Sequence, residues 1–83
     1  MEVHEDGAGN VYCEVENLRV TYVPAASRST AKNWAGKDVI RFQTYGGDDS
    51  AKLYPGPELP VSSEETVTEL VSALIRVFLA SRR

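Results

Sequence analysis

Few residues of this sequence could take part in acid–base or nucleophilic chemistry. The chain has 83 residues, with one histidine, His4, and one cysteine, Cys13. His4 lies among acidic residues and glycines that offer little to bury, so we expect it in a mobile tail without a fixed catalytic geometry. Cys13 alternates with polar residues in a strand-like segment, which favours a buried structural thiol over a nucleophile. Neither residue therefore predicts a catalytic centre.

The other candidates for chemistry have simpler structural roles. Residues 48–49 are aspartates that follow two glycines, which is typical of a turn, and residues 64–65 are glutamates at the expected start of a helix. The Gly36-Lys37 pair lacks the second glycine and the hydroxyl residue of a phosphate-binding loop. One cysteine and one histidine cannot supply the usual four zinc ligands. We therefore expect a protein that is not an enzyme and has no metal or other cofactor.

The connection at residues 24–37 is the strongest candidate for a contact site. It is polar, aperiodic and long for a loop of a compact domain, and long loops are often functional. Cations beside an aromatic ring resemble a contact for phosphate or single-stranded nucleic acid. The net charge of −3 favours instead a solvated loop whose tryptophan covers the core or an interface, or a loop that binds an acidic protein surface. The candidate interaction residues are Arg28, Lys32, Trp34 and Lys37.

Four segments have the composition of strands: residues 11–23, 38–45, 51–54 and, as a candidate edge strand, 58–61. In the first of them, apolar residues occupy odd positions up to Val15 and even positions from Leu18. Because side chains alternate across a strand, this change of parity requires a one-residue bulge or a hairpin turn near Glu16-Asn17. We favour one bulged strand, since Glu-Asn is not a strong hairpin pair, and the hairpin stays open as the alternative. The strand order stays open with it.

Residues 63–81 are predicted to form one amphipathic helix. A serine at position 62 or 63 can cap its start, and the acidic first turn suits the helix dipole. Ile75 and Leu79 widen the apolar sector beyond what a small sheet needs, which predicts an interface with a second copy of the chain. The narrower stripe, at spacings of three and four residues, is expected to cover the sheet: Val67, Leu70, Val71, Leu74 and Phe78.

Two tyrosines complete the candidate interface. Tyr12 and Tyr45 fall on predicted strands, opposite the main apolar positions. Aromatic residues on strands mostly serve sheet packing, but exposed tyrosines are enriched at binding hot spots. We therefore group both with Ile75 and Leu79 as candidate interface residues.

These elements predict an α+β fold, in which a small antiparallel sheet of three to four strands is covered on one face by a single C-terminal helix. A disordered acidic tail at residues 1–10 would precede a single domain at residues 11–83. A chain of this length without disulfides often gains stability from a partner chain. The predicted function is a small non-catalytic interaction module, accessory or regulatory and homodimeric. The alternative is a nucleic-acid-associated protein that contacts phosphates through the connection.

The expected location is the cytoplasm. The first residues lack the basic start and apolar run of a signal peptide. The longest nearly apolar run, residues 74–80, contains Arg76 and is too short to cross a bilayer. We expect a soluble protein that binds a protein partner or a second copy of itself and does not bind a membrane.

Overall fold

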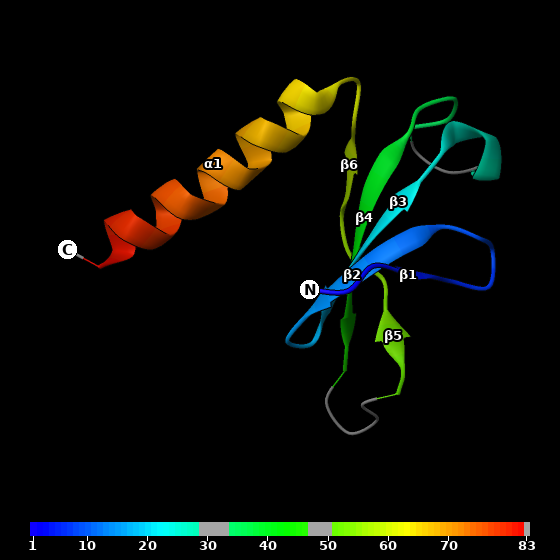
Figure 1. Cartoon of the computed structure of the whole chain (residues 1–83), viewed down its shortest axis with the longest axis horizontal. Helices are drawn as coiled ribbons and strands as arrows, with labels where there is room; N and C mark the ends of the chain where they lie inside the picture. Colours follow the sequence, from blue (N-terminus) through cyan, green and yellow to red (C-terminus); the bar gives the residue numbers. More distant parts are fainter. Residues whose placement is uncertain (29–33, 47–50, 83) are drawn as a thin grey trace.

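The computed structural model describes residues 1–28, 34–46 and 51–82, which form one antiparallel sheet and one helix (Figure 1). The strands are β1 (His4–Glu5), β2 (Val11–Val15), β3 (Leu18–Val23), β4 (Val39–Tyr45), β5 (Leu53–Tyr54) and β6 (Glu58–Pro60). A short 3-10 helix, η1 (Ala25–Ser27), follows β3, and the helix α1 (Glu64–Ser81) follows β6. The predicted α+β class is confirmed. The described sheet has six strands, however, where three to four were expected.

The residues predicted to be a disordered tail instead contribute a strand. β1 pairs antiparallel with β2, with His4 opposite Tyr12. The turn between them is organised by Asp6, whose carboxylate accepts hydrogen bonds from the backbone N–H groups of Ala8 and Asn10, both at 2.9 Å. These bonds lower the pKa of Asp6, with the Asn10 N–H as the largest cause. Residues 1–10 therefore carry a turn signal in Asp6 that composition alone does not reveal.

The change of apolar parity after Val15 is produced by a hairpin, so the preference for one bulged strand was wrong. β2 pairs antiparallel with β3, with Val15 opposite Leu18 across a two-residue turn. Glu16 adopts the left-handed conformation that such a turn requires, with φ of 54°. The carbonyl of Asn17 accepts a hydrogen bond of 2.9 Å from the Tyr45 N–H, which fastens the turn to β4.

β4 is the central strand of the sheet. β3 pairs along one edge of β4, while β5 and β6 lie end to end along the other edge. The segment 55–57, Pro-Gly-Pro, separates these two short strands. Its backbone passes so close to β4 that a Cβ atom on Gly56 would lie 2.4 Å from the carbonyl oxygen of Phe42. The edge therefore depends on glycine at this position.

One face of the sheet, here called the core face, holds the buried residues. Thr21, Val23 and Val39 are each no more than 2% exposed, and the two valines are the only fully buried apolar side chains among the described residues. The strand register places Val23 opposite Val39, and Val39 opposite Pro60. Paired residues share a face, so this small cluster lies at the end of the sheet next to η1.

The opposite face, here called the apolar face, is only half-buried. Its members follow from the register, because Cys13 pairs with Val20, Val20 with Phe42, and Ile40 with both Tyr22 and Leu59. Each of these side chains remains partly or largely accessible to solvent. The apolar face of the sheet therefore lacks a cover within the described residues.

The helix has the predicted bounds but not the predicted packing. α1 begins after Ser63, which takes an extended N-cap conformation, and it ends at Ser81. None of its residues is buried, and the extensive contacts between described elements all join strands to strands. Figure 1 shows α1 leaving the end of β6 and running away from the sheet. The prediction that this helix covers the sheet of its own chain is therefore wrong.

The connection from β6 to α1 explains this position. The N–H of Val61 still donates to the Asp38 carbonyl at 2.9 Å, so the sheet holds the chain until just before Ser62 and Ser63. The radius of gyration of 14.1 Å exceeds the value of about 12 Å expected for a compact chain of this length. The amphipathic pattern identified the side of the helix that needs burial but not the surface that buries it.

We expect Gly56→Ala to destabilise the sheet by roughly 1–3 kcal/mol, because its new methyl group would meet the backbone of β4. Urea unfolding followed by circular dichroism would measure the loss. Gly7→Ala is the matched control, since a Cβ atom there has no other atom within 4 Å. Equal stability of the two variants would contradict the close approach of segment 55–57 to β4.

Candidate functional site

Arg28, the first cation of the predicted contact loop, is buried in an ion pair. Its guanidinium donates two hydrogen bonds of 3.1 Å to the two carboxylate oxygens of Glu58, and its side chain is 1% exposed. Arg41 donates to the same carboxylate at 3.0 Å. The two arginines lower the pKa of Glu58, Arg28 being the larger cause. Arg28 thus holds the connection against the core face and is not available to a phosphate.

Asp38 fixes the other end of the same connection. One carboxylate oxygen accepts a hydrogen bond of 2.8 Å from the Ala25 N–H at the start of η1, and the other accepts one of 2.7 Å from the Tyr22 hydroxyl. The Ala25 bond is the largest cause of the lowered pKa of Asp38, and the Tyr22 hydroxyl has a raised pKa because it donates to this carboxylate. The carboxylate thus joins the residues on either side of the connection.

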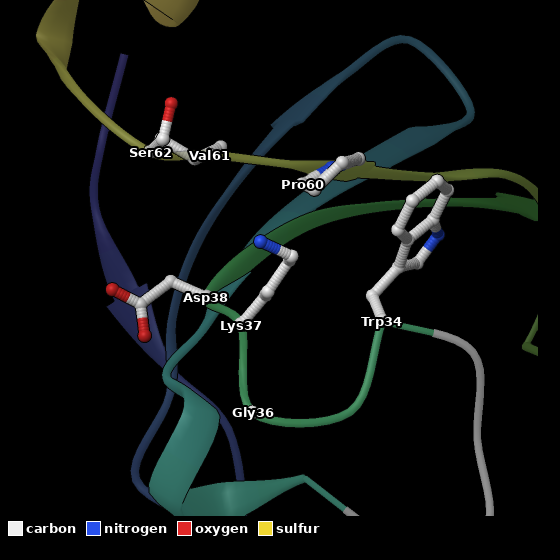
Figure 2. A pocket seen from close by; sticks show the side chains of 7 residues that line it. All are labelled: Trp34, Gly36, Lys37, Asp38, Pro60, Val61 and Ser62. Atoms are coloured by element: carbon white, nitrogen blue, oxygen red, sulfur yellow. The ribbon is translucent and has the colours of Figure 1, made fainter.

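Trp34 and Lys37 are brought together in a turn that lines an open pocket of about 520 Å³. Figure 2 shows both side chains projecting from this turn toward the Pro60–Ser62 segment, while the Asp38 carboxylate points away. The turn is closed by a hydrogen bond of 3.0 Å from the Lys37 N–H to the Trp34 carbonyl. Lys32, the remaining candidate of the loop, lies outside the described residues.

Trp34 has an uncommon backbone conformation for a large residue. Its φ is 64°, in the left-handed region that bulky side chains rarely adopt, and 45% of the residue remains exposed. Strain of this kind is often found where a side chain is presented for binding. The pocket offers one aromatic wall and one cation, which suits a contact surface. The Asp38 carboxylate, although it belongs to a residue of the lining, is engaged by Ala25 and Tyr22.

Tyr12 and Tyr45 lie on the core face, Tyr12 opposite Thr21 and Tyr45 at the end of β4 far from η1. The Arg19 guanidinium stacks 3.9 Å from the centre of the Tyr12 ring and donates to the Tyr45 hydroxyl at 2.6 Å. The Tyr45 hydroxyl donates to Glu14, and this bond is the main cause of both the raised pKa of Tyr45 and the lowered pKa of Glu14. Both tyrosines are half-buried in a polar cluster, away from Ile75 and Leu79.

The candidate interface residues of α1 belong to a larger exposed surface. Ile75 is 53% exposed and Leu79 59% exposed, so both are accessible to a partner, and their place in an interface stays a prediction. The residues expected to face the sheet are also exposed, Leu74 by 62% and Phe78 by 57%. Sequence reasoning therefore missed that the whole stripe, and the apolar face of the sheet with it, lacks a cover in the described chain.

The described residues contain no cluster of three or more His, Cys, Asp or Glu side chains suited to a metal ion. Within the same part of the chain, no helix combines the length and the apolar character needed to cross a membrane. No family model, curated protein or solved structure matches this chain. Any functional conclusion must therefore come from the surfaces themselves.

We expect the stability of the protein to fall in acid in a way that depends on Glu58. Its pKa in the folded chain lies below the ordinary 4.5, so the unfolded chain takes up the proton first. The stabilisation is complete above about pH 4.5 and is lost as the pH falls through the lower folded pKa.

Urea unfolding at a series of pH values would measure this dependence. Glu58→Gln should lower the free energy of unfolding by roughly 1–3 kcal/mol at neutral pH. It should also reduce the fall of this free energy with decreasing pH, here called the acid limb of the stability curve. Glu69→Gln, on the exposed helix, is the control and should leave both unchanged. Identical acid limbs in the wild type and Glu58→Gln would show that the ion pair does not form.

We expect little binding of single-stranded oligonucleotides, because Arg28 is already paired with Glu58 and the net charge is negative. Fluorescence anisotropy of labelled DNA and RNA at low salt would test this. Binding that weakens steeply with salt and is lost in Lys37→Ala would instead support the nucleic-acid alternative.

Proposed function

We propose that this protein is a non-catalytic interaction module that works as a homodimer and associates through the apolar stripe of α1. The observation that carries the proposal is the exposure of this helix. Seven of its large apolar residues are between 37% and 71% exposed: Val67, Val71, Leu74, Ile75, Val77, Phe78 and Leu79. An apolar strip of this size on a small protein is typical of an interaction site.

The stability of the helix supports the same conclusion. An isolated helix of 18 residues is marginal in water, and most helices in proteins are stabilised by packing of their apolar side. α1 is rich in β-branched residues, with Val, Thr and Ile throughout, which lowers its intrinsic propensity further. The helix therefore needs a packing partner that the described part of its own chain does not provide.

The small core supports association as well. Val23 and Val39 are the only fully buried apolar side chains in the described residues. Full burial of one large apolar side chain is worth about 1.5–3 kcal/mol, so covering the stripe would add more apolar stabilisation than this core supplies. An accessory or regulatory protein of this kind, with its free Cys13, suits the reducing environment of the cytoplasm.

The nucleic-acid alternative has weaker support. Of its candidate residues, Trp34 and Lys37 share an open pocket, but Arg28 is paired with Glu58. Within the described part of the connection, one unpaired cation and one aromatic ring line the pocket, which is little of the positive surface that follows a nucleic-acid backbone. The homodimeric interaction module is therefore better supported than the nucleic-acid-associated protein.

We expect Leu74→Asp to weaken association by at least about tenfold, because it places a charge in the middle of the apolar stripe. Sedimentation velocity over a range of concentrations would measure the dissociation constant. Arg76→Gln changes the net charge by the same amount on the polar side of the helix and should associate as the wild type does. A wild-type chain that stays monomeric at high concentration would overturn the proposal.

A further inference from the structure

We propose that the homodimer forms by helix exchange, in which α1 of each chain packs on the apolar face of the sheet of its partner. This inference rests on the proposed homodimer and specifies which surfaces meet. It starts from two apolar surfaces that the described residues leave uncovered, the stripe of α1 and the apolar face of the sheet. Each is an apolar surface of the kind that a helix or a sheet buries against a second element to form a core.

The apolar face has a shape that can receive a helix. Seven residues from the β1–β4 region line a shallow groove of about 220 Å³, with little polar surface: Val3, Val11, Tyr12, Cys13, Val20, Tyr22 and Ile40. The register places the Tyr12 side chain on the core face, so the apolar groove is formed by the side chains of the other six. The groove crosses β2, β3 and β4, so it is supported by the best-paired part of the sheet. A helix packed on a sheet buries this kind of surface in α+β proteins.

The path of the chain favours a partner over self-cover. β6 lies on the edge of the sheet, and the Val61 N–H bonded to the Asp38 carbonyl keeps the chain on that edge. After β6 the chain bends, and α1 runs obliquely away from the sheet of its own chain (Figure 1). Since α1 makes no extensive contact with the described strands, its apolar stripe stays accessible to a second molecule.

The sizes of the two surfaces are compatible. A helix of 18 residues is about 27 Å long, and five neighbouring strands are about 19 Å wide. Covering the stripe and the facing sheet in both copies would bury roughly 2,000–3,000 Å², which is in the range of obligate homodimers. A contact between the helices alone would bury less and leave both sheets open.

A second copy of the chain is the partner that best fits the apolar face, because it can cover both apolar surfaces at once. In a two-fold symmetric pair, each chain offers one helix and one sheet face and receives one of each. Both apolar surfaces of both chains are then covered by the same operation. An unrelated helix on the sheet would leave α1 exposed, and an unrelated surface on α1 would leave the sheet exposed.

Cross-linking between two different chains tests the exchange directly. Cys13 is the only native thiol, and it lies on the apolar face. The first chain is the wild type labelled with nitrogen-15, and the second is an unlabelled Cys13→Ser chain with Leu74→Cys. After mixing and equilibration, a short bismaleimide is added, and the linked peptides are identified by mass spectrometry. No chain carries both thiols, so a link between positions 13 and 74 can only join two molecules.

We expect this mixed link, and its loss when Leu74→Cys is replaced by Glu69→Cys on the polar side of the helix. A dimer by sedimentation that gives only links between two positions 74 would overturn helix exchange and leave the homodimer standing. A monomer would overturn both proposals. In that case Leu74→Cys in the wild-type chain would show, by a link within one molecule, whether α1 folds back onto its own sheet.

Discussion

The carboxylate of Glu58 accepts hydrogen bonds from Arg28 and Arg41, and this junction joins three separate parts of the chain on the core face of the sheet. Arg28 belongs to the connection after β3, Arg41 to the central strand and Glu58 to an edge strand. One carboxylate therefore fastens the connection to the core face, on the side where Val23 and Val39 are buried. The apolar face receives no comparable cover from the described residues, so the two faces of the sheet differ in how much apolar surface they leave accessible.

A polar junction on the closed face has a consequence for stability. Charged groups are costly to bury, and a buried ion pair fixes geometry more than it adds net stability. The core face thus holds the ion pairs that fix the position of the connection. Many of the apolar residues lie instead on the apolar face and on α1. If these surfaces are covered only by association, folding of the helix and formation of the dimer are coupled, and the helix content depends on protein concentration.

Local patterns predicted much of the fold. The alternation around residues 38–45 and the spacing around residues 63–81 located β4 and α1 to within a residue or so. Long-range relations were missed, because they leave no local signal: the partner of Arg28 lies 30 residues away, and periodicity does not say what covers a helix. The one local signal was Glu58 itself. A glutamate in a short strand indicates that a cation lies near it on the same face of the sheet.

The prolines and the short edge strands limit the ways in which copies of the protein can join. One edge of the sheet ends in β1, which has two residues, and the other is divided into β5 and β6, with Pro60 inside β6. Long, flat edges invite open-ended strand pairing between molecules, whereas short, interrupted ones resist it. With its edges blunted in this way, the sheet presents its broad face to other molecules, so association through that face can stop at a closed pair instead of growing into aggregates.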